Sequence, residues 1–318
     1  MKITVIGCGR WGSCIAWYLD HIGHEVSLYG REGSANMRRF MAERRNDYIE
    51  LPESIRLTTD ISSVFESEAV VISIGSQNLE KLVEQLDGMG VKDKIFILCM
   101  KGIEMGTGRR LSQIAKDGLD ASNRVAVWIG PGHVQEFYRG VPNCMVIDSE
   151  DEQLKTYLVG RFSSELIRFY YGADLIGNEV GAAAKNVIGI AAGMLDGLGL
   201  TTLKGALMSR GTREIARLIA AMGGNELSAY GLCHLGDYEA TVFSQYSHNR
   251  RYGEMLVRGE HYGKLAEGCY TVKALMLLSE RYGVELPICS AVNDVLYNGA
   301  EPKAAVAALF SRSLKQEF

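Results

Sequence analysis

The stretch VIGCGRWG, at residues 5–12, places Gly7, Gly9 and Gly12 in a G-x-G-x-x-G spacing. It completes the β-branched run KITVIG (2–7), which is typical of a strand, and leads into GSCIAWYLDHIG (12–23), whose apolar spacing is helical. In that context the first glycine permits a tight turn, the second lets a pyrophosphate approach the backbone, and the third lets helix and strand pack closely. The pattern predicts a dinucleotide-binding turn; the alternative is a glycine-rich turn without a ligand.

The first half of the chain continues this alternation of strand and helix. Apolar runs predict further strands at 24–30, 69–75, 94–100, 124–130 and 143–148. Because these runs are apolar on both faces, they fit a parallel sheet with helices on both sides. We therefore predict an α/β fold with an amino-terminal Rossmann-type, doubly wound sheet.

The second half has a different composition. From about Asn178 the chain is rich in Ala, Gly, Leu and Met at helical spacing, which predicts helices near 178–195, 203–222, 271–283, 287–297 and 302–312. We expect a dinucleotide-binding domain at 1–175 and an all-helical substrate and catalytic domain at 176–318. The helical domain could also support a homodimer.

The overall composition argues against several classes of protein. The 318 residues carry a net charge of −4, so no long-range positive field would gather nucleic acid or a membrane surface. No apolar run is long enough for a membrane span. The seven cysteines are scattered and the six histidines lack metal-ligand spacing, so we expect reduced thiols, no metal site and a cytoplasmic location.

The end of the second predicted strand bears on the choice of dinucleotide. NAD-selective proteins commonly place an acidic residue there to hold the ribose 2′-hydroxyl. Here Gly30 and Arg31 occupy this position. An arginine can pair with a 2′-phosphate, so the sequence slightly favours NADP over NAD. The alternative is that Glu32 holds the ribose and Arg31 lies in solvent.

Two other predicted strand ends carry candidate ligand contacts. Ligands of an open α/β sheet lie beyond the carboxyl ends of its strands. Lys101 directly follows one such strand, and the turn of Gly130, Pro131 and Gly132 follows another. The lysine would present an ammonium to a ligand, and the turn would bring backbone amides near it. For Lys101 the alternative is a solvated loop residue.

The segment GAAAKNVIGIAAG (181–193) places Lys185 inside an apolar helix. Its neighbours three and four residues away are Gly181, Ala182, Ile188 and Gly189, a nearly bare face that predicts room for a ligand. Burial lowers the pKa of a lysine, which suits proton donation to the alkoxide formed when hydride reduces a ketone. The alternative is an ion pair with a carboxylate such as Glu179 or Asp237.

The segment QYSHNRRYG (245–253) combines uncharged donors with fixed cations. Ser247, Asn249, Arg250 and Arg251 have the composition of a phosphate-binding segment. Together with the two lysines and the dinucleotide turn, this composition predicts a phosphorylated carbonyl substrate. The alternative, for the segment taken alone, is a helix start with its arginines in solvent.

These segments together resemble one family along essentially the whole chain. The sequence is similar to the bacterial-type NAD(P)-dependent glycerol-3-phosphate dehydrogenases. The matching segments are GCGRWG, KGIE, GPGH, VGAAAKNVIGIAAGMLDGLGL, LGD, SHNRRYGE, EGCYTVKAL and YGVELPICSAVNDVLY. The resemblance implies reversible reduction of dihydroxyacetone phosphate by NAD(P)H, giving sn-glycerol 3-phosphate for phospholipid synthesis.

The resemblance also implies residue roles. Lys185 would be the proton donor and acceptor, and Lys101 would contact both substrate and nicotinamide. The other implied substrate contacts are Gly130, Gly132, Asp237, Ser247, His248 and Asn249. The other implied cofactor contacts are Gly7, Gly9, Arg10, Trp11, Gly12, Arg31, Val134, His248, Leu265 and Glu267.

The chain departs from the family pattern near the implied substrate contacts. His248 stands where the family usually has an arginine that bridges substrate phosphate and cofactor, so phosphate contacts should weaken unless Arg250 or Arg251 substitutes. Gly132 stands where the family has a serine, IGSQ replaces a proline-containing turn, and HLGDYEA replaces a more apolar segment. Two alternatives therefore remain: a related dehydrogenase for another phosphorylated or anionic ketone, and a cofactor-binding regulator without turnover.

Overall fold

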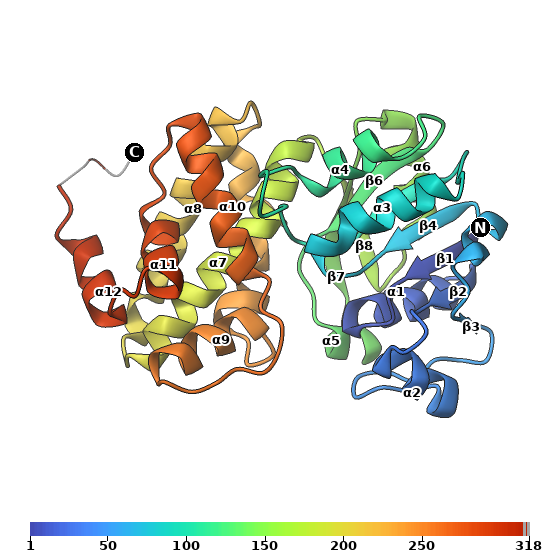
Figure 1. The fold of residues 1–318 in the computed structure, drawn as a ribbon, viewed down its shortest axis with the longest axis horizontal. Helices are drawn as coiled ribbons and strands as arrows, with labels where there is room; N and C mark the ends of the chain where they lie inside the picture. The colour runs from blue at the N-terminus through green and yellow to red at the C-terminus, as the bar shows by residue number, and fades with distance from the viewer. Residues whose placement is uncertain (314–315, 317–318) are drawn as a thin grey trace. The chain divides into compact units, whose positions relative to one another are not determined.

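The computed structural model describes residues 1–313 and 316, and the chain divides into two compact units (Figure 1). The first comprises Met1–Lys101 and Arg109–Leu175, and the second comprises Gly102–Gly108 and the chain from Ile176 onward. The sequence-based division placed 102–108 in the first domain. In the structure this segment joins the second unit, because Ile103 is fully buried in the hydrophobic cluster of the helices.

The first unit is built on an eight-stranded sheet of strand order β3-β2-β1-β4-β5-β6-β7-β8. The first six strands of that order are parallel, as in a doubly wound nucleotide-binding fold, whereas β7 pairs antiparallel with β6 and parallel with β8. The predicted α/β class is confirmed. The strands are β1 (Lys2–Ile6), β2 (Glu25–Tyr29), β3 (Arg56–Thr58), β4 (Ala69–Ile72), β5 (Ile95–Leu98), β6 (Arg124–Ile129), β7 (Asn143–Asp148) and β8 (Ile167–Tyr171).

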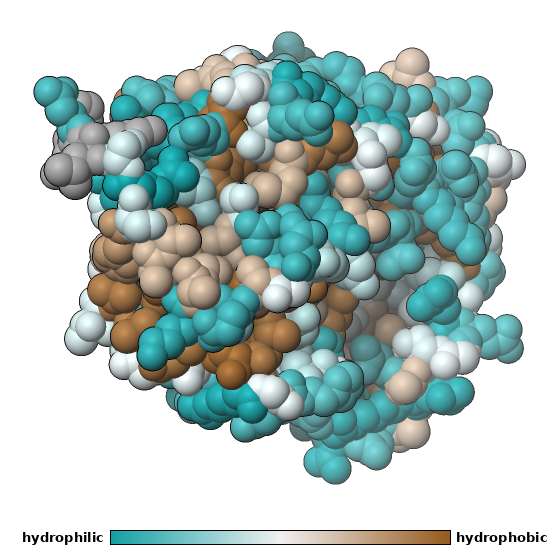
Figure 2. Space-filling model, turned by 60° about the vertical axis from the view of Figure 1, so that its left-hand side comes forward, coloured by the Kyte–Doolittle hydropathy of each residue, from teal (hydrophilic) through white to brown (hydrophobic). Residues whose placement is uncertain are grey.

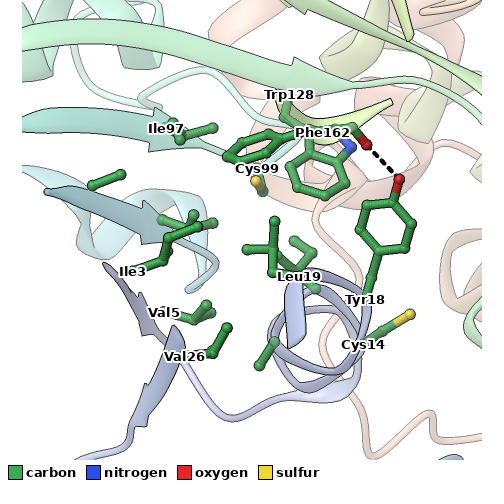
Figure 3. Packing of buried hydrophobic residues seen from close by; sticks show 14 of the residues in the cluster. Ile3, Val5, Cys14, Tyr18, Leu19, Val26, Ile97, Cys99, Trp128 and Phe162 are labelled. Carbon is green, nitrogen blue, oxygen red and sulfur yellow. Dashed lines mark hydrogen bonds between the residues drawn. The ribbon is translucent and has the colours of Figure 1, made fainter. Parts of the chain in front are cut away.

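Helices lie on both faces of the sheet, so its central strands are apolar on both faces (Figure 1). Figure 3 shows one face, where Ile3, Val5 and Ile97 meet Leu19 and Trp128. Tyr18 also lies in this core, and its hydroxyl donates to the Phe162 carbonyl. The helices of this unit are α1 (Arg10–His21), α2 (Ala35–Glu43), α3 (Leu79–Gly88), α4 (Leu111–Gly118), α5 (Val134–Tyr138) and α6 (Glu152–Phe162), with short 3-10 turns η1 (Ile61–Glu66) and η2 (Ser76–Asn78).

The second unit is helical and is centred on α7 (Leu175–Gly197), in which every residue from Glu179 to Leu195 is buried. Its length and small, apolar composition let other helices pack closely against it. The remaining α-helices are α8 (Lys204–Ala221), α9 (His248–Val257), α10 (Gly268–Tyr282), α11 (Pro287–Tyr297) and α12 (Pro302–Phe310). Short turns lie between them at η3 (Thr201–Leu203), η4 (Glu226–Tyr230), η5 (Leu235–Asp237) and η6 (Glu239–Phe243), the last of which is a π-helix.

Two strands, β3 and β8, and the helix α9 were not predicted from the sequence pattern, and the helices α2 to α6 were expected only as unspecified connections between the strands. The three-residue β3 and the polar-faced β8 are the two edges of the sheet, where one-sided burial weakens the apolar signal. The exposed polar surface of α9 likewise hides its helical period, although Ser247 was a recognisable helix start.

The terminal helix α12 has an unusual surface. Its sequence PKAAVAALF is apolar, yet none of its residues is buried and Phe310 is 68% exposed. Figure 2 shows apolar side chains gathered on the surface of the helical unit below the grey carboxyl-terminal residues. Separately, every helix in the described part of the chain is too short or too polar to cross a bilayer.

Candidate active site

The glycine-rich turn joins β1 to α1 in the first unit. Gly7 has a φ of +116°, and a Cβ there would lie 2.1 Å from the Ser73 carbonyl oxygen. A Cβ on Gly12 would lie 1.9 Å from the Gly7 carbonyl oxygen, whereas one on Gly9 would meet nothing within 4 Å. The N-cap residue of α1 is Gly9, which has no side chain to cap the first turn. Because backbone N–H groups at such a helix start bind anions, the turn fits the pyrophosphate of a dinucleotide.

Arg10 and Trp11, both predicted cofactor contacts, open α1 beside this turn. The Arg10 guanidinium lies 5.7 Å from the centroid of the Tyr48 ring. The centroids of the Trp11 and Phe137 rings lie 6.0 Å apart, and the Trp11 indole N–H is buried with no acceptor among the described residues. Trp11 is therefore held by aromatic packing and keeps a hydrogen-bond donor that the protein does not use.

The Phe137 ring also restricts which residue can occupy position 132. Its φ is +146°, and a Cβ there would lie 2.3 Å from the Phe137 ring, which is 1% exposed. The Phe137 ring therefore fills the space that a side chain at position 132 would need. Val134, another predicted cofactor contact, is buried at the start of α5.

Lys101 and Gly130 meet in the structure, as expected for residues beyond neighbouring strand ends. The Lys101 ammonium donates to the Gly130 carbonyl at 2.5 Å, and Gly130 itself has a φ of +136°. This bond orients a half-buried cation at the carboxyl ends of β5 and β6. Lys101 is thus a half-buried loop residue whose direction is set by this hydrogen bond.

The end of β2 holds a separate opening. Arg31 is exposed and lines a cavity of ≈ 550 Å³ together with residues of α2 and the end of β3. In doubly wound folds the ribose end of a dinucleotide lies at this end of the second strand.

In the second unit, Lys185 lies on α7 and is 6% exposed. The bare face predicted around it is occupied by protein. A Cβ on Gly181 would lie 3.0 Å from the His234 Cβ, and one on Gly189 would lie 2.7 Å from the Thr241 Cγ2. The expectation of ligand space over these two glycines is wrong, because the small residues instead admit the segment that contains His234 and Thr241.

Lys185 forms a compact polar cluster with that segment. Its ammonium lies 2.7 Å from the Asp237 carboxylate and donates to the Thr241 hydroxyl at 2.8 Å, and that hydroxyl donates to the Asp237 backbone carbonyl at 2.8 Å. Asp237 is 1% exposed. The carboxylate stabilises the ammonium against the cost of burial and fixes its direction. Proton donation and pairing with Asp237, posed as alternatives from the sequence, are therefore compatible.

Thr241 and His234 were missed from the sequence. Asp237 and Thr241 are four residues apart, a spacing that places both on one helical face and could have revealed Thr241. The fully buried His234 interacts through Nδ1 with the Gly181 carbonyl at 2.8 Å and through Nε2 with the Tyr238 hydroxyl at 2.7 Å. Burial lowers the pKa of His234 to about 4, so its imidazole is neutral at pH 7.

The predicted phosphate segment forms the start of α9. Ser247 caps this helix by accepting from the Arg250 N–H, and the Asn249 side chain bridges α7 and α10. Asn249 donates to Asn186 at 3.0 Å and accepts from the Gly268 N–H at 2.9 Å. Asn249 therefore has a structural role in addition to any contact with substrate.

The basic side chains of this segment have different partners. Arg250 pairs with Asp196 at 2.6 Å and its side chain is 17% exposed, so this ion pair holds it inside the unit. His248 contacts the Tyr262 hydroxyl, and the Arg251 guanidinium lies 5.8 Å from the centroid of the Tyr262 ring. Farther along, Leu265 is 54% exposed and Glu267 precedes the first residue of α10.

Comparisons with known proteins agree with this arrangement. Models of the NAD-dependent glycerol-3-phosphate dehydrogenase N-terminus and C-terminus match residues 2–155 and 174–307. A glycerol-3-phosphate dehydrogenase [NAD(P)+] of Thermoanaerobacter sp. (strain X514) is 35% identical over 329 residues, which cover 100% of this chain and 99% of that protein. A similar enzyme of Chlorobium limicola is 32% identical over 332 residues, which cover 100% of this chain and 99% of that protein.

A solved structure of similar fold is the glycerol-3-phosphate dehydrogenase from Coxiella burnetii. It has a TM-score of 0.90 and 28% identity, and the match covers 98% of this chain and 99% of that one.

Proposed function

The chain belongs to the NAD-dependent glycerol-3-phosphate dehydrogenase family, and from this premise we propose that Lys185 is the proton donor in its reaction. The activity is reversible, NAD(P)H-dependent reduction of dihydroxyacetone phosphate to sn-glycerol 3-phosphate. The observation that supports Lys185 in this role is its buried cluster with Asp237 and Thr241, because an ammonium there is oriented by two fixed oxygen atoms.

The proton-transfer step follows from that cluster. When bound, the nicotinamide supplies a hydride to the carbonyl carbon of the ketone. Charge then develops on the carbonyl oxygen, and the Lys185 ammonium stabilises it in a site of low dielectric. An N–H bond of the ammonium breaks as the O–H bond of the alcohol forms, which leaves a neutral amine that solvent protonates again. Asp237 stabilises the charged form of Lys185 before the transfer, and Thr241 fixes its direction.

The remaining contacts divide by ligand. We propose that Lys101 orients the substrate carbonyl, with its own position set by Gly130. Support for a phosphorylated substrate comes from the donors at the start of α9. The proposed substrate contacts are Lys101, Gly130, Gly132, Lys185, Asp237, Ser247, His248 and Asn249, and the proposed cofactor contacts are Gly7, Gly9, Arg10, Trp11, Gly12, Arg31, Lys101, Val134, His248, Leu265 and Glu267.

A steady-state assay tests this proposal. Purified protein should oxidise NADPH or NADH only when dihydroxyacetone phosphate is added, with a Michaelis constant in the usual enzyme range of ~1 μM–1 mM. Tight cofactor binding without turnover of any ketone would contradict it and would favour a regulator.

One observation favours a second substrate class. His248 contacts Tyr262, and Arg250 is committed to Asp196, so α9 offers a phosphate fewer fixed cations than its sequence suggests. A related dehydrogenase for another anionic ketone would show higher kcat/KM with an α-keto acid than with dihydroxyacetone phosphate. A panel of both substrate types in the same assay separates the two activities.

We further propose that residues 1–175 hold the dinucleotide, that residues 176–318 hold the substrate, and that the protein forms a cytoplasmic homodimer. The exposed apolar surface of α12 supports self-association, because an apolar helix in water is stabilised when a second copy covers it. Sedimentation of the protein should give a dimer mass that Phe310→Asp reduces. The seven free thiols agree with a reducing compartment, and cell fractionation would test that location.

A further inference from the structure

The cavity at the end of β2 carries a second arginine that the sequence pattern did not identify. Arg38 lies on α2 and lines the same ≈ 550 Å³ cavity as Arg31. Both residues are exposed. The two positions are seven residues apart, in a loop and a helix, so only the fold brings them to one opening.

These two arginines differ from the other arginines of this region. Arg39 pairs with Asp47 at 2.6 Å, Arg44 with Glu53 at 3.4 Å, and Arg45 with Glu43 at 3.3 Å. In residues 1–313 and 316, no ion pair or hydrogen bond engages the guanidinium of Arg31 or Arg38. The cations that line the cavity are therefore the ones left available for a ligand.

The rest of the lining limits the chemistry of that ligand. Met37, Met41 and Ala42 give the cavity an apolar wall, and Met41 is 49% exposed. An aromatic ring would cover this surface, since thioether sulfur contacts aromatic rings favourably. Two guanidinium groups select a dianionic phosphate, because each can form paired, charge-assisted hydrogen bonds. An apolar wall beside two arginines therefore fits an adenine next to a phosphate.

We propose that Arg38 acts with Arg31 to bind the 2′-phosphate of NADP and makes this chain selective for NADP over NAD. The inference rests on the proposed function, in that the first unit binds the dinucleotide. The glycine turn that fits a pyrophosphate belongs to the same unit and follows β1, the neighbour of β2 in the sheet. One nucleotide can therefore be held at the turn by its pyrophosphate and at the cavity by its adenosine.

Glu32 also lines the cavity and bears on the alternative ligand. In an NAD-selective site this carboxylate would accept from the ribose hydroxyls, and Glu32→Gln would weaken NAD⁺ binding. With a 2′-phosphate between the arginines, the same carboxylate repels the ligand. Glu32→Gln should therefore tighten NADP⁺ binding and leave NAD⁺ binding within about twofold; loss of NAD⁺ affinity alone would overturn the proposal.

The test uses nucleotide fragments that need no substrate and no turnover. Calorimetry on the full chain should show tighter binding of 2′,5′-ADP than of 5′-AMP. Arg38→Gln should weaken 2′,5′-ADP binding about 10- to 100-fold and leave 5′-AMP binding within about twofold. Arg45→Gln is the matched control, because Arg45 is exposed on the same segment but outside the cavity, and it should change neither affinity.

Two results would overturn the proposal. One is equal affinity of the wild-type protein for 2′,5′-ADP and 5′-AMP, and the other is an equal loss of both affinities in Arg38→Gln. If either occurs while the protein still reduces dihydroxyacetone phosphate with NADH, the selectivity inference fails and the proposed function stands. If neither fragment nor either dinucleotide binds, both fail.

Discussion

Two of the buried lysines, Lys155 in the first unit and Lys185 in the second, differ in what surrounds them. Lys155 on α6 is 4% exposed and Lys185 on α7 is 6% exposed. The Lys155 ammonium lies 2.6 Å from both the Gly172 carbonyl and the Glu152 carboxylate, and 3.7 Å from Asp148. Two hydrogen bonds and one longer ion pair hold the ammonium, and they tie α6 to the ends of β7 and β8. Lys155 therefore has the surroundings of a structural cross-link.

Lys185 instead pairs with side chains of a single irregular segment. Asp237 and Thr241 lie in and after the 3-10 turn η5, where the backbone passes into the π-helix η6. Single π-turns often mark functional sites. Burial, which the two lysines share, is therefore not what supports Lys185 as the proposed proton donor. The identity and origin of the oxygen atoms around the ammonium separate the two cases.

Replacing each lysine should show the difference between their roles most strongly in kcat. Lys185→Ala should lower kcat by about 10²- to 10⁴-fold, because it removes the proton donor, and should leave NADPH binding nearly unchanged. Lys155→Met should leave the kcat of the folded protein unchanged. Stopped-flow turnover and cofactor fluorescence measure both effects. Ordinary turnover by Lys185→Ala would refute its role.

The Lys155 substitution, which should not change kcat, should instead lower the stability of the protein. Lys155→Met removes the ammonium that lies 3.7 Å from the Asp148 carboxylate, 2% exposed, and should lower the free energy of unfolding by about 3–5 kcal/mol. Urea denaturation followed by circular dichroism measures this loss. The double variant Lys155→Met with Asp148→Asn should recover part of it. No loss of stability in the single variant would show that Lys155 is not a cross-link.

His234 predicts a pH dependence specific to the second unit. Its pKa is ordinarily 6.5 and falls to about 4 in the folded protein. Between pH 6.5 and 4 the unfolded chain binds a proton on His234 that the folded chain does not. The free energy of unfolding should therefore fall by about 1.4 kcal/mol for each unit by which the pH decreases within this window. Above the window, His234 should not contribute to any change of stability with pH.

Urea denaturation at pH 7 and pH 5 checks that expectation. His234→Gln has no titrating imidazole, so its stability should change less between the two pH values than that of the wild-type protein. An identical pH dependence in both proteins would mean that groups other than His234 cause it.

A smaller effect is expected at His248. His248→Arg adds a fixed cation at the start of α9 and should lower the KM for dihydroxyacetone phosphate by up to about tenfold, with little change in kcat. His248→Gln, which adds no charge, is the matched control. Steady-state kinetics at pH 7.5 measures both. An unchanged KM in His248→Arg would indicate that another residue already holds the phosphate.

The sequence was most informative where the residues of a motif lie close together along the chain. Gly7, Gly9 and Gly12 occur within six residues, and the structure places them as the pattern predicts. The family predicted from the quoted motifs is confirmed by matches to both of its domain models. Lys185 was recognised because its neighbours along α7 are small, whereas Lys155 lies in an ordinary amphipathic segment and carried no such signal.

The sequence was least informative where residues distant along the chain meet. Lys185 and Thr241 are 56 residues apart, so neither predicts the other. The two glycines beside Lys185 were interpreted as space for a ligand, because a sequence shows small residues but not what packs against them. The sequence suggested Arg250 as a phosphate contact but did not reveal its ion pair with Asp196.

The doubly wound sheet, the helical second half and the dinucleotide turn could all be predicted from the amino-acid sequence, because periodic burial and glycine conformations depend on neighbouring residues. Tertiary structure alone decided the partners of Lys185, the commitment of Arg250 and the shared cavity of Arg31 and Arg38. Those outcomes depend on distances across the fold, and the energies of ion pairs and hydrogen bonds change steeply with distance and burial.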